Sequence, residues 1–195
     1  PEAQKEQYMD AILAASSNLS LMVTNILKLN KLENQRIFPA PESYPLGEQL
    51  RLCALGFMER WQEKNIAFSI DVADVTVRYD PSLLELVWNN LLSNAIKFTP
   101  RGGAIALTSH TEGNKVFVTV RDTGCGMDAQ SQQKMLEKFY QGDPSHAVEG
   151  NGLGLALVKK VLEIVNGEIS VRSSPGEGSA FTVVLETDAA SAHIS

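Results

Sequence analysis

The chain has 195 residues, of which 44% are hydrophobic and 21% are charged, and its formal net charge is −6. This composition is that of a globular protein with one sizeable core. The acidic balance argues against a nucleic-acid-binding protein, which would usually present a basic face. No apolar run approaches the roughly 20 residues of a membrane helix, and no signal peptide is recognisable, so we expect a cytoplasmic fragment without membrane contact.

The two cysteines and three histidines follow no metal-site pattern. Cys53 and Cys125 lie far apart in the sequence, which favours reduced thiols. His110, His146 and His193 form no ligand cluster. Any metal ion is therefore expected to use other side chains.

Residues 4–35 contain neither glycine nor proline and predict one long helix, roughly 45 Å in length. Its apolar residues recur three and four positions apart: Met9, Ile12, Leu13, Leu19, Val23, Ile26 and Leu27. A helix of this length needs a partner, and the apolar seam predicts a helical bundle or a coiled coil. The alternative is a helix that lies across its own domain, but the proline-rich segment 38–45 has the composition of a separating linker.

From residue 46 onward, helical and strand patterns occur in mixed order. We predict helices over 46–64, 81–98, 129–137 and 151–165, strands around 66–70 and 75–79, and hairpins over 104–121 and 168–186. Asp80-Pro81 provides an N-cap and a first helical residue, and Asn166-Gly167 ends the last helix. Alternating strands imply a sheet with one face covered by helices, hence a two-layer α+β fold.

The helix predicted over 81–98 carries an unusual polar face. Asn90, Asn94 and Lys97 are spaced at i, i+4 and i+7 and therefore share one side of the helix. Asparagine is unfavourable there because its amide competes for backbone hydrogen bonds. A merely solvated face would usually carry Glu, Lys or Gln. Amide oxygens can ligate a hard cation such as Mg²⁺, and the lysine can meet phosphate oxygens.

Two glycine-rich turns accompany this helix. Asp122-Thr123-Gly124-Cys125-Gly126 follows a strand directly, and its glycines let the backbone approach a ligand, although Asp-x-Gly is also common turn chemistry. Gly150-Asn151-Gly152-Leu153-Gly154 enters a helix, whose first N–H groups can bind an anion. It matches neither a dinucleotide-binding fingerprint nor a Gly-Lys-Ser/Thr phosphate loop. The polar segment 140–149 before it is predicted to be a mobile lid.

Taken in this order, the motifs resemble the histidine-kinase branch of the ATPase superfamily that also holds DNA gyrase B, Hsp90 and MutL. Asn90-x-x-x-Asn94-Ala95-x-Lys97-Phe98 resembles the N box, Asp122-x-Gly124-x-Gly126 the G1 box, Lys138-Phe139-Tyr140 the F box, Gly150-x-Gly152-Leu153-Gly154 the G2 box, and Gly176-x-Gly178-x-x-Phe181 the following glycine motif. The last of these, read alone, is only a hairpin turn. The resemblance covers about residues 46–186.

The resemblance implies a two-layer sandwich of the Bergerat type that binds ATP and Mg²⁺. Asn94 would ligate Mg²⁺, Lys97 would contact phosphate, and Asp122 would bind the adenine amine. The other implied nucleotide-binding residues are Asn90, Gly124, Gly126, Phe139, Tyr140, Gly150, Gly152, Leu153, Gly154 and Ser179. The implied organisation is the second helix of a dimerisation bundle over 1–36, a linker over 37–45, the catalytic domain over 46–187 and a flexible tail over 188–195.

Position 90 separates two branches of this superfamily. ATP-hydrolysing relatives place a Glu four residues before the Mg²⁺-binding Asn, whereas this chain has Asn90, which cannot accept a proton. A histidine acceptor needs no such base because the imidazole is itself the nucleophile. The resemblance therefore implies a protein histidine kinase with Asn90 and Lys97 as catalytic residues. The alternatives are a hydrolytic ATPase, a nucleotide-binding scaffold without kinase activity and, less suited to the long helix, a serine kinase.

The family's acceptor histidine lies in a stretch like His-Glu-x-Arg-Thr-Pro, which this sequence does not contain. We therefore expect a fragment that binds ATP but does not phosphorylate itself, although His146 could contact phosphate in the lid. The resemblance further implies a homodimer through the first helix, a response-regulator receiver domain as partner, and membrane anchoring of the full-length protein. Many relatives carry a lid arginine. Segment 140–149 has none, which leaves Lys97, Mg²⁺ and loop N–H groups to stabilise the transferring phosphoryl group.

Overall fold

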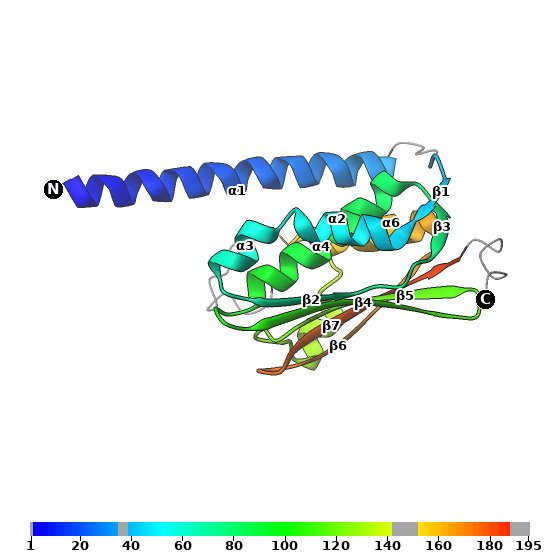
Figure 1. Cartoon of the computed structure of the whole chain (residues 1–195). Coiled ribbons are helices and arrows are strands. Elements are labelled where there is room, and N and C mark those ends of the chain that lie inside the picture. Colours follow the sequence, from blue (N-terminus) through cyan, green and yellow to red (C-terminus); the bar gives the residue numbers. More distant parts are fainter. Residues whose placement is uncertain (1, 35–38, 142–151, 188–195) are drawn as a thin grey trace.

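The computed structural model describes residues 2–34, 39–141 and 152–187. The longer helices lie on one face of a five-stranded sheet (Figure 1), which confirms the predicted two-layer α+β fold. Within these ranges, no helix combines the length and apolarity that crossing a bilayer requires. The tail predicted over 188–195 and the lid residues 142–149 lie outside the described residues.

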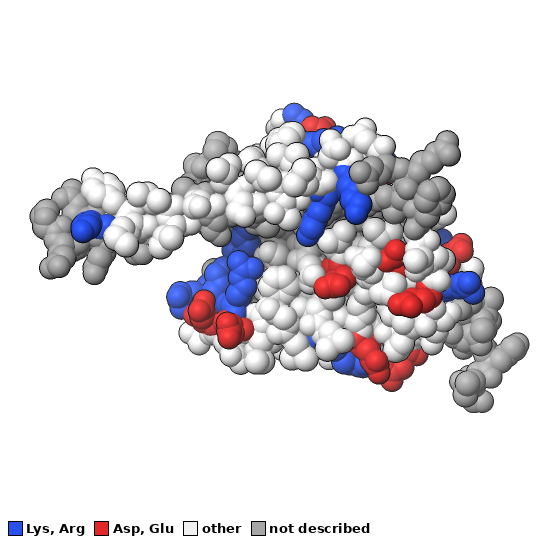
Figure 2. Space-filling model, turned by 90° about the horizontal axis from the view of Figure 1, so that it is seen from above, with Lys and Arg blue, Asp and Glu red and all other residues white. Residues whose placement is uncertain are grey.

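Helix α1 (Glu2–Asn34) confirms the predicted long helix, and its N-terminal part projects beyond the rest of the molecule (Figures 1 and 2). Its last turns pack on the domain, where Leu29 and Leu32 are only 5% and 7% exposed. The interpretation of a helix lying across its own domain therefore holds for this end of α1. The predicted apolar seam is exposed along its whole length: Met9, Ile12, Leu13, Leu19, Val23, Ile26 and Leu27. The bundle that would cover it stays a prediction.

Part of the segment predicted to be a linker is a strand. Strand β1 (Glu42–Pro45) pairs antiparallel with β3 (Thr76–Tyr79) in a separate two-stranded sheet. The prolines in and before it, Pro45, Pro39 and Pro41, hide the strand from pattern analysis, because proline lacks the N–H that a strand ladder uses. The linker also contacts the start of a later helix, since the Ala40 amide donates at 3.1 Å to Oδ2 of Asp80, the residue before Pro81.

The helix predicted over 46–64 is two helices, α2 (Leu46–Leu55) and α3 (Met58–Glu63). The chain breaks at Gly56, where glycine's low helix propensity allows a turn that local hydrogen bonds close. The Gly56 amide donates to Leu52 O at 3.1 Å, and the Phe57 amide donates to Ala54 O at 2.9 Å. The predicted single helix was therefore wrong at its middle.

The main sheet has the strand order β2-β4-β5-β7-β6. Its strands are β2 (Ala67–Asp71), β4 (Ala104–Glu112), β5 (Lys115–Asp122), β6 (Glu168–Ser174) and β7 (Gly178–Glu186). Only β2 and β4 are parallel, and the other neighbours are antiparallel. The two predicted hairpins are confirmed, whereas the strands predicted at 66–70 and 75–79 belong to different sheets.

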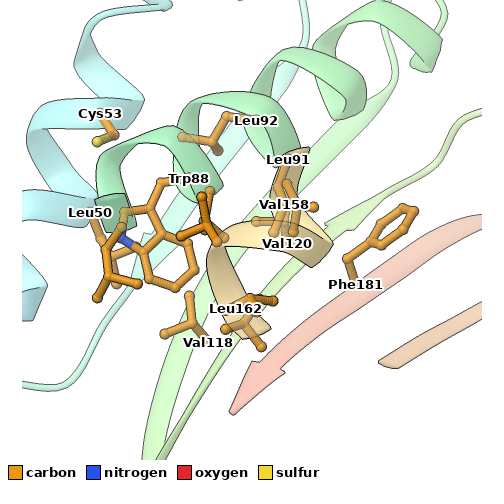
Figure 3. Packing of buried hydrophobic residues seen from close by; sticks show 14 of the residues in the cluster. Leu50, Cys53, Trp88, Leu91, Leu92, Val118, Val120, Val158, Leu162 and Phe181 are labelled. Carbon is orange, nitrogen blue, oxygen red and sulfur yellow. The ribbon is translucent and has the colours of Figure 1, made fainter. Parts of the chain in front are cut away.

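The core lies between this sheet and helices α2, α4 (Pro81–Phe98) and α6 (Gly154–Val165). Figure 3 shows Trp88 and Leu91 of α4 beside Val118 and Val120 of β5. The Trp88 Nε1 group donates to Gln49 Oε1 at 3.0 Å, which satisfies the indole N–H inside the core. Helix α4 is therefore held on two sides, with its polar face left for the site.

A short helix, α5 (Ala129–Lys134), follows β5, and it ends three residues before the predicted boundary. On the face shown in Figure 2, acidic and basic side chains of the described residues are interspersed. No broad basic surface forms among the described residues on that face, in keeping with the acidic net charge of −6.

Candidate functional site

Helix α4 is anchored at both ends by side chains. At its start, Asp80 Oδ1 accepts from the amides of Ser82 and Leu83 at 3.0 and 3.4 Å, as its predicted N-cap role requires. Partial burial alone would raise the pKa of Asp80, but these bonds and those from the Ser82 hydroxyl and the Ala40 amide hold it below its ordinary value. The start of α4 is therefore fixed while its carboxylate cap stays ionised.

At the end of α4, the Lys64 ammonium donates to three main-chain carbonyls. Its Nζ lies 2.7 Å from Ile96 O, 3.0 Å from Lys97 O and 2.8 Å from Thr99 O. These are carbonyls that a helix end leaves without intrahelical partners. Partial burial lowers the pKa of Lys64, and the positive charges of Arg101 and Arg60 lower it further. The sequence analysis missed Lys64, because no local pattern links residue 64 to a helix end more than 30 residues away.

The predicted polar face of α4 exists, and its three members are all half-buried. Asn90 uses its Nδ2 to donate to Leu86 O on its own helix at 2.6 Å. Its Oδ1 points to the start of α6, where a Cβ placed on Gly154 would lie only 2.7 Å away. A side chain at position 154 would displace the Asn90 amide or the start of α6, so α4 and the G2 box meet closely at Asn90.

Asn94 and Lys97 occupy the next turns on this face. Among the described residues, none forms a hydrogen bond with the Asn94 side chain. The Lys97 Nζ lies 4.6 Å from the centre of the Phe98 ring, within cation–π range. By helix geometry both side chains share the Asn90 face of α4, one and two turns further along.

The predicted Asp122 turn begins at the end of β5. Asp122 is only 5% exposed, and its Oδ1 accepts from the Gly124 amide at 2.8 Å. Burial raises the pKa of Asp122, while hydrogen bonds from the Gly124 and Ser179 amides oppose this rise. The turn lies against the end of α4, since a Cβ on Gly124 would come within 2.8 Å of Phe98 O. The G1 and N boxes are therefore neighbours.

The final hairpin completes this corner of the sheet. Ser179 on β7 lies directly opposite Asp122 in the register of the two strands. Gly178 has a φ of +88°, and a Cβ there would lie 2.0 Å from Asp122 O, so no other residue fits without a backbone shift. The backbone of Gly126 lies against Ser174 O in the same way. A turn that the sequence alone marked only as a hairpin is thus packed on the Asp122 motif.

The F box contacts the start of the G2 box through its backbone. The Phe139 amide donates to Gly152 O at 3.0 Å, and Phe139 itself is 59% exposed with a φ of +62°. The Tyr140 hydroxyl lies 3.2 Å from Ser131 Oγ on α5. Leu153 is buried at 1% exposure beside the start of α6.

Gly150 and His146, two predicted site residues, lie outside the described residues.

A small cavity separates the F box from α1. It has a volume of about 140 Å³ and is lined by Ile26, Leu29, Asn30, Glu33, Lys138, Phe139 and Leu153. None of its lining residues belongs to α4, and of the predicted nucleotide-binding residues only Phe139 and Leu153 line it. The cavity therefore marks the contact between α1 and the domain, not the polar face of α4.

The contacts join three predicted motifs, the N, G1 and G2 boxes, into one site. The polar face of α4 meets the start of α6 at Asn90, and its last turn meets the Asp122 turn at Phe98. A helix N-terminus can bind an anion, and a buried carboxylate can accept hydrogen bonds from an amine. Amide oxygens on α4 can ligate a hard cation. The site can therefore hold a ligand with an amine at one end and phosphates at the other.

Comparison with known proteins agrees with this geometry. Residues 79–189 match the family described as histidine kinase-, DNA gyrase B- and HSP90-like ATPases. The chain is 32% identical to an uncharacterized sensor-like histidine kinase of Rhizobium meliloti, over 97% of this chain and 37% of that protein. It is 32% identical to the sensor histidine kinase RcsC of Escherichia coli, over 91% of this chain and 19% of that protein. The chain thus spans less than two-fifths of either relative.

Two solved structures show the same fold over most of the chain. Full-length ShkA in complex with AMPPNP has a TM-score of 0.81 and 27% identity, covering 94% of this chain and 39% of ShkA. The histidine kinase ThkA in complex with the response regulator protein TrrA has a TM-score of 0.77 and 25% identity, covering 93% of this chain and 51% of ThkA. Both similarities include α1 as well as the sheet domain, because they extend over more than nine-tenths of the chain.

Proposed function

Because the chain belongs to the family of histidine kinase-, DNA gyrase B- and HSP90-like ATPases, we propose that it is the ATP-binding catalytic part of a sensor histidine kinase. In the proposed reaction, an imidazole nitrogen of the acceptor histidine attacks the γ-phosphorus of ATP. The bond from this phosphorus to the β–γ bridging oxygen breaks, and ADP leaves. The acceptor is a histidine in another segment of the longer protein.

The observation that carries ATP binding is the junction of three motifs around α4. Asp122 presents a buried carboxylate whose accepting capacity suits the adenine amine. The start of α6 lies against Asn90 on the polar face of α4, where its N–H groups suit phosphate. Lys97 on the same face supplies a cation for the phosphate chain. One elongated ligand can therefore engage all three.

The side chains of α4 also fit a magnesium ion. Asn94 is half-buried, hydrogen-bonds to none of the described residues, and offers a neutral amide oxygen of the kind that Mg²⁺ accepts together with substrate phosphates. We propose that Asn94 holds the ion with the nucleotide. When bound, Mg²⁺ neutralises part of the phosphate charge.

Asn90 supports a kinase over a hydrolase. Its Nδ2 already donates to Leu86 O, and its amide oxygen cannot remove a proton from water at neutral pH. Hydrolytic relatives of the superfamily require such a base at this position, whereas transfer to an imidazole does not. We propose that Asn90 holds the start of α6 in place beside the phosphates. Steady ATP hydrolysis that Asn90→Ala abolished would instead support the hydrolase.

The partners follow from the same proposal. The exposed apolar seam of α1 requires a covering surface, and we propose that residues 1–36 pair with a second copy in a helical bundle. Residues 37–45 then connect the bundle to the catalytic domain at 46–187. The ThkA–TrrA complex supports a response-regulator receiver domain as the recipient of the phosphoryl group. We place the fragment in the cytoplasm and propose that the longer protein is membrane-anchored.

Incubation with ATP labelled at the γ-phosphate tests the proposal. The fragment alone should bind Mg-ATP without forming phosphohistidine, and the full-length protein should become labelled at an acid-labile histidine. Asn94→Ala should abolish the Mg²⁺ dependence of binding, while Asn89→Ala, on a different side of the same helix, should leave it intact. Acid-labile label on the fragment alone, or no label on the full-length protein, would contradict the proposal.

A further inference from the structure

Ser173 stands in one cross-strand row with two predicted site residues. The register places Asp122 of β5 opposite Ser179 of β7, and Ser179 opposite Ser173 of β6. Residues directly opposite each other project from the same face of a sheet. Asp122 lies on the same face of its strand as the buried Val118 and Val120, two and four residues before it, so this row faces the helices. Ser173 is therefore one strand removed from the proposed adenine contact.

The Ser173 hydroxyl has three polar neighbours. Its Oγ accepts from the Met127 amide at 2.8 Å, donates to Gly178 O at 2.9 Å, and lies 3.0 Å from Ser179 Oγ. These contacts tie the turn after Asp122 to the turn that positions Ser179. The loop after Asp122 and the β6–β7 hairpin, which are distant in sequence, thus meet at one oxygen.

The three contacts determine the direction of the bond between the two serines. A hydroxyl has one proton and two acceptor sites. The carbonyl of Gly178 can only accept, so the Ser173 proton is used there, and the Met127 amide occupies one acceptor site. Ser179 must therefore donate its own proton to Ser173. Ser179 is left with acceptor sites only, directly opposite the Asp122 carboxylate in the ladder.

We propose that Ser173 is a positioning residue that makes the site selective for adenine, by holding the Ser179 hydroxyl as an acceptor beside Asp122. This inference rests on the proposed binding of ATP. The 6-amino group of adenine donates hydrogen bonds, whereas hypoxanthine and guanine present a carbonyl oxygen at that position. Two acceptors side by side favour the amine and repel the carbonyl. Without Ser173, the Ser179 proton can rotate toward the base and offer a donor.

A contact made by Gln132 allows an effect of Ser173 on nucleotide selectivity to be separated from an effect on folding. Gln132 Nε2 donates to Met127 O and to Ser173 O, at 3.0 Å in each case. Both acceptors are main-chain atoms, so this bridge between the Asp122 loop and β6 survives the loss of the Ser173 side chain. Ser173→Ala should therefore fold with the loop in place and alter only the hydroxyl network.

The experiment compares ATP with inosine triphosphate, which replaces the 6-amino group by a carbonyl. Dissociation constants of both nucleotides would be measured by competition against a fluorescent ATP analogue, for the unaltered chain, Ser173→Ala and Ser173→Thr. Ser170→Ala, an exposed serine on the same strand, is the matched control. Ser173→Ala should weaken ATP about three- to tenfold, the effect of one hydrogen bond, without weakening inosine triphosphate. Ser173→Thr should restore the preference.

The outcomes separate this inference from the proposed function. If Ser173→Ala weakens both nucleotides equally, or changes neither, Ser173 has no role in selectivity and the inference is wrong while ATP binding stands. If the unaltered chain does not bind ATP, the proposed function fails and this inference fails with it. A midpoint of thermal unfolding for Ser173→Ala close to that of Ser170→Ala would confirm that the fold is retained.

Discussion

Lys138 and Glu33 form an ion pair across 105 residues of sequence, with the lysine Nζ 2.7 Å from one carboxylate oxygen and 2.8 Å from the other. The pair joins α1 to the F box beside Phe139, whose amide donates to Gly152 O. The end of the proposed bundle helix is therefore in contact with the segment that leads into the G2 box.

Removing the ion pair should cost little stability. The Lys138 and Glu33 side chains are 47% and 33% exposed, and exposed pairs of this kind contribute about 0–1 kcal/mol. Lys138→Met should therefore lower the free energy of unfolding by less than about 1 kcal/mol in urea titrations. Amide hydrogen exchange near Leu29 should nevertheless accelerate, because the end of α1 loses a tether. Lys134→Met, on α5, is the control, and unchanged exchange at Leu29 would contradict the prediction.

Replacing Gly154 by alanine should be destabilising through Asn90. The new Cβ would lie 2.7 Å from Asn90 Oδ1, closer than such contacts permit. Overpacking of this kind costs about 1–3 kcal/mol. Gly154→Ala should therefore lower the free energy of unfolding, because either the Asn90 amide leaves its bond to Leu86 O or the start of α6 moves. ATP binding should weaken in both cases, since both groups belong to the proposed site. In an Asn90→Ala background the obstructing oxygen is absent, so a double-mutant cycle should show that the cost of Gly154→Ala falls. Additive costs would show that Asn90 is not the obstacle.

Lys64→Met should loosen the end of α4. The substitution leaves the carbonyls of Ile96, Lys97 and Thr99 without their ammonium donor. Unsatisfied polar groups of this kind cost about 1–3 kcal/mol, and the negative end of the helix also loses a neighbouring cation. Chemical denaturation should report this loss, and ATP affinity should fall with it because Lys97 lies in the same turn. Lys64→Arg keeps the charge and should recover part of the lost free energy of unfolding. Arg51→Met, which removes an exposed ion pair with Asp74, should lower the free energy of unfolding less than Lys64→Met does.

Asp122→Asn should not lower stability at neutral pH. Burial raises the pKa of Asp122 despite the amides of Gly124 and Ser179. A carboxyl group whose pKa is raised by folding holds its proton more tightly in the folded state. The contribution of Asp122 to the free energy of unfolding therefore falls as the pH rises from the ordinary pKa of an aspartate, about 3.9, toward its raised pKa in the folded state. Urea unfolding should show Asp122→Asn as stable as the unaltered chain, or more so, at pH 7, with the difference shrinking toward pH 4. A less stable variant at pH 7 would refute this.

The same variant should lose affinity for ATP. A hydrogen bond to a charged group contributes about 1.5–3 kcal/mol, and 1.4 kcal/mol corresponds to a factor of ten in affinity. Asp122→Asn should therefore raise the dissociation constant of ATP by roughly tenfold or more in calorimetric titrations. Asp71→Asn, at an exposed strand end, provides the control. Equal ATP affinity in the two variants would exclude Asp122 from the adenine contact.

Much of the fold follows from local patterns, and the failures have physical causes. The period of 3.6 residues located α4 and its polar face, and the Asp80-Pro81 cap located its start. The alternation of valines located β5. Strand β1 was missed because the prolines in and before it are typical of a linker. The break at Gly56 was missed because one glycine inside a helical pattern is often tolerated. These errors concern boundaries and pairing, which depend on partners elsewhere in the chain.

The sequence by itself determined which residues share a face and which motifs occur in which order, because helix and strand geometry converts spacing directly into direction. It therefore placed Asn90, Asn94 and Lys97 together and identified Asp122 as a turn at a strand end. Only the tertiary structure decided that Lys64 caps α4, that Glu33 pairs with Lys138, and that Ser173 reaches the Asp122 loop through Met127. These contacts join residues 32 to 105 positions apart, and no local period carries information over such separations.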